Sequence, residues 1–152
     1  MNQIPDAFVK RIKKEQNFLV TSVGISHPYD EDHITRKPKP HWTSGLWDTG
    51  ASHCLITKSL AENFDLNPID KVMVEHAKGR TYENVYLAFL QITDRYYLEV
   101  ELTECQSISN NFEIIIGMDV ISKGDFAVTS KKGEMCFSFR LPSLTTIDFT
   151  KG

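Results

Sequence analysis

Short apolar runs separated by polar turns cover most of the chain. Residues 17–25 (NFLVTSVGI) and 41–47 (HWTSGLW) carry apolar and β-branched side chains, and residues 27–40 between them are polar and contain proline. Residues 96–104 (YYLEVELTE) alternate apolar and acidic positions, which is typical of a strand with one buried face. We therefore predict three strands, the first two of them joined by a loop.

Two further segments predict β-hairpins. Residues 71–76 and 81–92 are separated by the turn sequence AKGR (77–80), in which Gly79 supplies a permissive backbone. Residues 125–141 form a second apolar pair of strands around the sequence KKG. Both turns join segments close in sequence, so each pair is expected to be antiparallel.

Brief helices are predicted at two places. Residues 56–64 (ITKSLAENF) have a helical apolar face, with Thr57 as the expected N-cap and Pro68 shortly beyond the end. Residues 112–117 (FEIIIG) predict a short strand buried on both faces. Residues 118–124 (MDVISKG) then predict one or two helical turns, closed at the C-terminal cap by the final glycine.

The N-terminal segment combines basic and apolar positions. Residues 8–14 (FVKRIKK) carry a short amphipathic pattern with a basic run, which favours a solvated helical face. No apolar region follows these charges, so we expect no signal peptide.

Composition fits a single globular domain. The chain has 152 residues, 41% of them hydrophobic and 24% charged, and its many short strands predict a mainly antiparallel β-barrel or sandwich. A net charge of -3 offers no basic field for nucleic acid, and no apolar run approaches the roughly 18 residues that span a membrane. Three widely spaced cysteines imply neither a disulfide framework nor zinc, so a reducing, cytoplasmic compartment is expected.

One polar segment raises the question of a metal. Residues 27–33 (HPYDEDH) hold two histidines and three acids, which is an imaginable metal site. Nothing in the sequence fixes the geometry of these side chains, so a solvated acidic loop is favoured. We predict no metal and no cofactor.

The candidate chemistry lies in residues 44–56, SGLWDTGASHCLI. Asp48 ends an apolar run and precedes a Thr-Gly-Ala-Ser turn whose backbone N–H groups and hydroxyls favour an ionised carboxylate. One such acid is a poor proton shuttle, whereas two carboxylates within about 3 Å share a proton and supply a base and an acid together. The chain contains no second Asp-Thr-Gly, so a second copy across a two-fold axis is the expected source of the other acid.

These motifs resemble a known family. The sequence LWDTGAS (46–52) is followed by a hairpin around 76–87 and, about 70 residues after Asp48, by the sequence IIGMD (115–119). Together they resemble the retropepsin-like, single-domain aspartic proteases, closest to bacterial or phage-borne members. The resemblance implies a closed antiparallel β-barrel with one or two short helices, acting as a homodimer on an extended polypeptide.

The resemblance also implies roles for the active-site loop. Asp48 would be the catalytic carboxylate, and Thr49 would grip the loop of the partner subunit. Gly50 would bind the substrate backbone, and Ala51 and Ser52 would complete the loop.

Two other segments would support this loop. The tip of a flap that covers the substrate would be formed by Ala77, Lys78, Gly79 and Arg80. Ile116 and Gly117 would pass behind the active-site loop. Asp119 would cap the short helix or pair with a base near the interface.

The resemblance divides the chain and leaves two functions open. It implies an N-terminal extension (1–16), a protease domain (17–141) and a C-terminal tail (142–152). The first function is an aspartic endopeptidase with a dyad of two Asp48 carboxylates. The alternative is a non-catalytic dimeric module that keeps the fold and binds peptides or supports assembly.

Overall fold

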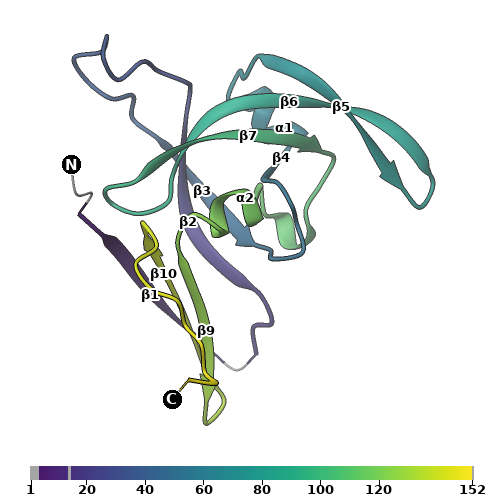
Figure 1. The fold of residues 1–152 in the computed structure, drawn as a ribbon. Helices are drawn as coiled ribbons and strands as arrows, with labels where there is room; N and C mark the ends of the chain where they lie inside the picture. Colours follow the sequence, from purple (N-terminus) through teal and green to yellow (C-terminus); the bar gives the residue numbers. More distant parts are fainter. Residues whose placement is uncertain (1–3, 14, 152) are drawn as a thin grey trace.

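The computed structural model describes residues 4–13 and 15–151, which form a mainly β structure (Figure 1). Its elements are β1 (Asp6–Ile12), β2 (Leu19–Ser26), β3 (His41–Trp47), β4 (Leu55–Thr57), α1 (Lys58–Asn63), β5 (Pro68–His76), β6 (Gly79–Gln91), β7 (Tyr97–Cys105), the 3-10 turn η1 (Ser109–Asn111), β8 (Ile114–Ile116), α2 (Met118–Ile121), β9 (Asp125–Lys131) and β10 (Glu134–Leu141). Among the described residues, no helix has the length and apolar character to cross a membrane.

The strands form two sheets. The smaller has the order β1-β10-β9, and the larger has the order β2-β3-β8-β4-β7-β6-β5, with a further pairing of β2 with β6. Most pairings are antiparallel, as predicted, but β3–β8 and β4–β7 are parallel, which the sequence did not indicate. Long connections separate these partners in sequence, and a parallel pair needs such a crossover.

Both predicted hairpins are confirmed. Strands β5 and β6 pair around Ala77 and Lys78, and Gly79 opens β6 with a φ of +134°. Strands β9 and β10 turn at Lys132 and Gly133, whose φ angles of 53° and 81° fit the two-residue turns that match strand twist.

The first predicted helix is also confirmed. Thr57 caps α1, because its side-chain oxygen accepts a hydrogen bond from the N–H of Leu60. Leu60 and Ala61 are the buried residues of α1, as the apolar face predicts.

Two local predictions are wrong. Residues 8–12 are strand rather than helix, because β1 pairs with β10 and places Phe8 opposite Phe139, whereas residue 14 of the predicted helical face lies outside the described residues. Gly124 is not the C-cap of α2, a position that Ser122 takes. A Cβ at Gly124 would lie 2.3 Å from the carbonyl oxygen of Arg140, so close packing explains this glycine.

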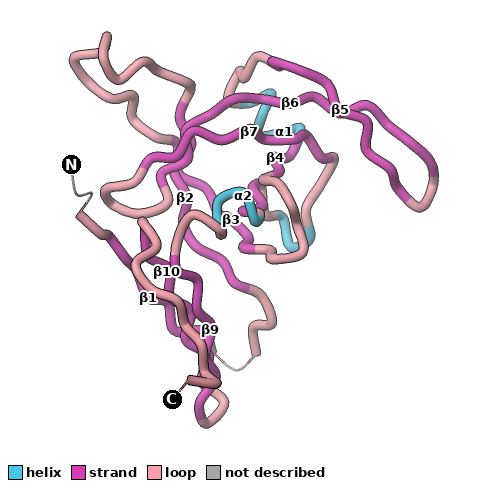
Figure 2. The backbone as a smooth tube through the Cα atoms, in the orientation of Figure 1, coloured by secondary structure: helices cyan, strands magenta, loops and turns pink. Residues whose placement is uncertain are grey.

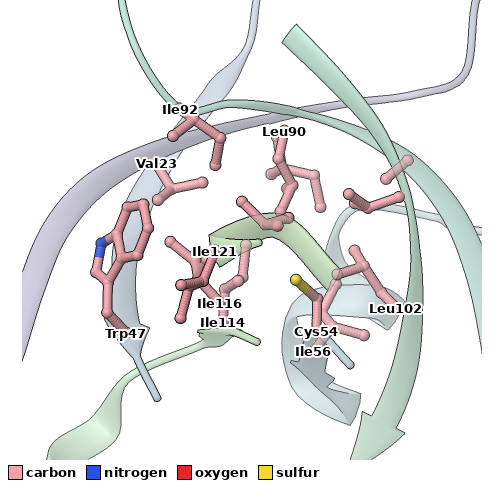
Figure 3. Close-up of a cluster of buried hydrophobic side chains, with 14 of the residues drawn as sticks. Val23, Trp47, Cys54, Ile56, Leu90, Ile92, Leu102, Ile114, Ile116 and Ile121 are labelled. Atoms are coloured by element: carbon pink, nitrogen blue, oxygen red, sulfur yellow. The ribbon is translucent and has the colours of Figure 1, made fainter. Parts of the chain in front are cut away.

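Trp47 joins the two sheets within the core (Figure 3). Its ring centroid lies 4.7 Å from that of Phe139 and 5.1 Å from that of Phe137, both on β10. Its indole N–H donates to the hydroxyl of Thr21 at 2.8 Å, so its one polar atom is satisfied. Because Trp47 immediately precedes Asp48, this packing fixes the point at which the candidate loop begins.

Candidate functional site

Asp48 lies at the end of β3, where the backbone of β8 holds it. Its N–H donates to the carbonyl oxygen of Ile116 at 3.0 Å, which continues the parallel pairing of Trp47 with Ile116. Its carboxylate oxygen Oδ1 accepts from the N–H of Gly50 at 2.8 Å, and its carbonyl accepts from the N–H of Ala51 at 3.2 Å. The acid is therefore held at a half-buried position by a tight turn.

Gly117 lies directly against the back of this turn. A Cβ at this position would lie 2.6 Å from the carbonyl carbon and oxygen of His53 and 2.9 Å from the carbonyl oxygen of Ala51. These are backbone atoms that have little room to move. The close approach explains why a glycine follows the apolar strand β8.

The start of α2 holds the carbonyl groups of the same turn. The N–H of Met118 donates to Ala51 at 2.8 Å, and the N–H of Asp119 donates to Ser52 at 3.2 Å. Amides near a helix start have no partner within the helix, so the turn supplies acceptors for them. The two segments that the sequence motif pairs are therefore in direct contact.

Asp119 ties the far end of the turn to α2. Its Oδ2 accepts from the N–H of Cys54 at 3.0 Å, and its Oδ1 lies 3.1 Å from the sulfur of the same residue. Burial raises the pKa of the Cys54 thiol, and the nearby Asp119 charge acts in the same direction. The thiol therefore stays protonated and donates to the carboxylate. Asp119 also accepts from the N–H of Val120 at 3.0 Å.

The outer side of the turn is open to solvent. Thr49, Gly50 and Ser52 are exposed, and Ala51 is half-buried. The Thr49 hydroxyl makes no hydrogen bond to any residue that the structure describes. This surface is available to another molecule.

The β5–β6 hairpin projects beyond the rest of the fold (Figure 2). Ala77, Lys78, Gly79 and Arg80 are all exposed at its tip. An ion pair between Arg80 and Glu75, at 2.8 Å, bridges its two strands. β5 is the terminal strand of the larger sheet, so no strand of the described chain pairs with its outer edge.

A cavity of about 740 Å³ lies between the turn and this hairpin. Its wall includes Ala51, Ser52 and His53 from the turn, so it begins three residues after Asp48. Residues 72–75 of β5 and residues 99–101 of β7 form other parts of the wall. The cavity thus lies between the later residues of the turn and the base of the hairpin. Asp48 and the hairpin tip 77–80 are not among its wall residues.

Sequence reasoning missed two features of this site. The contact between Cys54 and Asp119 joins residues 65 positions apart, and no local pattern signals it. Glu99 and Glu101 occupy polar positions of an alternating strand, and only the folded structure shows that they border the cavity.

The described residues hold no group of three or more histidine, cysteine or acidic side chains able to bind a metal ion. The segment 27–33 is a loop in which His33 contacts Asp30.

Comparisons with known proteins follow the same segments. The family model described as aspartyl protease matches residues 41–120. A crystal structure of a retropepsin-like aspartic protease from Rickettsia conorii is similar, with a TM-score of 0.54 and 9% identity over 92% of this chain and 98% of that chain. The solution structure of the simian foamy virus protease gives a TM-score of 0.47 and 14% identity, covering 68% of this chain and 92% of that one. No curated protein matches the chain.

Proposed function

The chain belongs to the aspartyl protease family and has retropepsin-like structural neighbours, and from this premise we propose that it is an endopeptidase with Asp48 as its catalytic carboxylate. One observation carries the proposal. A turn anchored on Ile116 and Gly117 carries Asp48, and the next residues of this turn, 51–53, line an open cavity that the β5–β6 hairpin borders.

The second carboxylate of the dyad comes from a second copy of the chain. The sequence contains one Asp-Thr-Gly, so a two-fold axis near the turn brings two Asp48 side chains together. When two carboxylates lie this close together, they cannot both ionise, so the pair shares one proton. The ionised acid takes a proton from water, the water attacks the peptide carbonyl carbon, and the protonated acid donates to the carbonyl oxygen.

Other residues of the turn have supporting roles in this proposal. The exposed hydroxyl of Thr49 has no partner among the described residues and forms a hydrogen bond with the turn of the second copy. Gly50 offers its backbone to the substrate, and Ala51 and Ser52 complete the loop. Their exposure or partial exposure supports these assignments.

The hairpin tip acts as a flap over the bound peptide. The tip residues are exposed, and residues 72–75 of the same hairpin line the cavity, which supports this role. Closure excludes water and adds backbone hydrogen bonds to an extended chain. The residues of the flap tip are Ala77, Lys78, Gly79 and Arg80.

Ile116, Gly117 and Asp119 act as structural supports behind the turn, and the contacts of their backbone and side chains favour this role.

We also propose that the larger sheet closes as a barrel. The pairing of β2 with β6 supports this closure, because it links the first strand of the order to the last but one.

The Asp48→Asn variant tests the function. The parent protein is incubated with a mixture of unstructured polypeptides from acidic to neutral pH, with and without an inhibitor of aspartic proteases. We expect inhibitor-sensitive cleavage by the parent and none by Asp48→Asn. The Asp32→Asn variant changes an exposed acid in the loop 27–40 and is the matched control.

Two outcomes contradict the proposal. Full cleavage by Asp48→Asn rejects Asp48 as the catalytic acid. A parent protein that binds peptides but cleaves none supports the non-catalytic module instead.

A further inference from the structure

Two glutamates of β7 contribute to the wall of the cavity. Glu99 and Glu101 are two positions apart, so they share one face of the strand, and both are exposed. Val100 between them and Leu102 beyond them are buried on the opposite face. Both glutamates belong to the wall of the cavity, to which Val100 also contributes.

These two carboxylates lack an ion-pair partner among the described residues. Four acids border the cavity, but Glu75 pairs with Arg80 and Asp119 accepts hydrogen bonds from Cys54. Glu99 and Glu101 form no ion pair or side-chain hydrogen bond within the described chain. Lys123 is the one lysine or arginine in the described wall, so negative charge predominates there.

The rest of the wall is largely aliphatic. Leu55, Val72, Val74 and Val85 line the same cavity. A lysine or arginine side chain suits this combination, because its methylene stem packs on apolar surface while its charged end meets carboxylates. An acidic side chain is repelled, and a purely aliphatic one leaves the carboxylates without a partner.

Building on the proposed function, we propose that Glu99 and Glu101 select polypeptide substrates that place a lysine or arginine side chain in this cavity. The cavity begins in the turn that carries Asp48, so the selected residue lies a few positions from the cleaved bond. The two glutamates are specificity-determining residues and take no part in the proton transfers at Asp48.

Paired peptides provide the test. A cleaved peptide is scanned with lysine at each position, and each lysine peptide is compared with its norleucine counterpart, which keeps the stem and removes the charge. We expect one position at which lysine raises kcat/KM about threefold to tenfold, the range for exposed ion pairs to two carboxylates. The gain should fall as salt concentration rises.

Two sets of variants test whether Glu99 and Glu101 cause the lysine preference. The Glu99→Gln/Glu101→Gln protein should lose the lysine preference and cleave the lysine and norleucine peptides with equal kcat/KM. The Glu15→Gln/Glu134→Gln protein changes net charge equally at two exposed positions away from the cavity and should keep the preference. Glu101→Lys should reverse the preference towards glutamate at the same peptide position.

Binding separates this inference from the proposed function. The same peptides are titrated into Asp48→Asn by fluorescence anisotropy, where cleavage is not needed. Lysine-dependent binding without any cleavage by the parent rejects the protease function and keeps the cavity selectivity. Equal binding of lysine and norleucine peptides at every position overturns the inference, as does a preference that survives in Glu99→Gln/Glu101→Gln.

Discussion

Asp119→Asn removes one acceptor from the junction between the turn and α2. The wild-type carboxylate accepts from the N–H and the thiol of Cys54 and from the N–H of Val120, at 3.0 to 3.1 Å. The amide keeps one oxygen and replaces the other with an NH₂ group. That NH₂ group then faces at least one of the former donors.

The expected cost follows from these contacts. A hydrogen bond to a charged group contributes about 1.5–3 kcal/mol, and the thiol recovers part of the loss by rotating to accept from the new amide. We therefore expect the free energy of unfolding to fall by about 2 kcal/mol. For a chain of this size, that change corresponds to a drop in Tm of roughly 4–8 °C.

Urea unfolding followed by tryptophan fluorescence measures this change, because Trp47 is buried beside the turn. Asp32→Asn removes an exposed carboxylate and should remain within about 0.5 kcal/mol of the parent. Cys54→Ser keeps a donor next to Asp119, so Asp119→Asn and Cys54→Ser should be non-additive when combined. An Asp119→Asn protein as stable as the Asp32→Asn control would refute the reasoning.

Two further changes test the supporting structure. Thr57→Ala removes the oxygen that accepts from the N–H of Leu60 and should lower the free energy of unfolding by about 1 kcal/mol in the same urea assay. Hydrogen bonds from Ser143 and the N–H of Leu144 hold the pKa of Asp125 well below its usual range, so Asp125 stabilises the fold above about pH 4 and this contribution is lost as pH falls further. Asp125→Asn should therefore destabilise by about 2 kcal/mol at neutral pH and progressively less below pH 4, and a pH-independent difference would contradict this assignment.

Local patterns in the sequence were sufficient to predict the hairpins and the first helix. The turn after Lys131 needs positive φ at two residues, and Gly133 supplies one of them. Thr57 caps α1 through contacts within one turn of chain. Such features depend on neighbouring residues, so a single sequence carries the information.

Long-range contacts determine the two local features that the sequence predicted wrongly. Residues 8–12 carry an amphipathic pattern, but pairing with β10 and packing of Phe8 on Trp47 make them a strand. Gly124 gave the signal of a helix cap, whereas the carbonyl of Arg140 explains its small size.

The candidate site also combines features that the sequence predicts with features that only long-range contacts determine. The motifs indicated the turn at Asp48 and the segment 115–119, and the structure brings these two segments into contact. The cavity wall does not follow from any motif, because β4 and β7 bring it together across the chain.

A mixing experiment tests most directly whether two copies share one active site. Parent and Asp48→Asn proteins are unfolded together, refolded at a constant total concentration and assayed for peptide cleavage. If each site needs Asp48 from both copies, an equal mixture retains about one quarter of the parent activity, because random pairing yields that fraction of fully active dimers. Retention of about one half would show that each copy acts alone and would contradict the shared dyad.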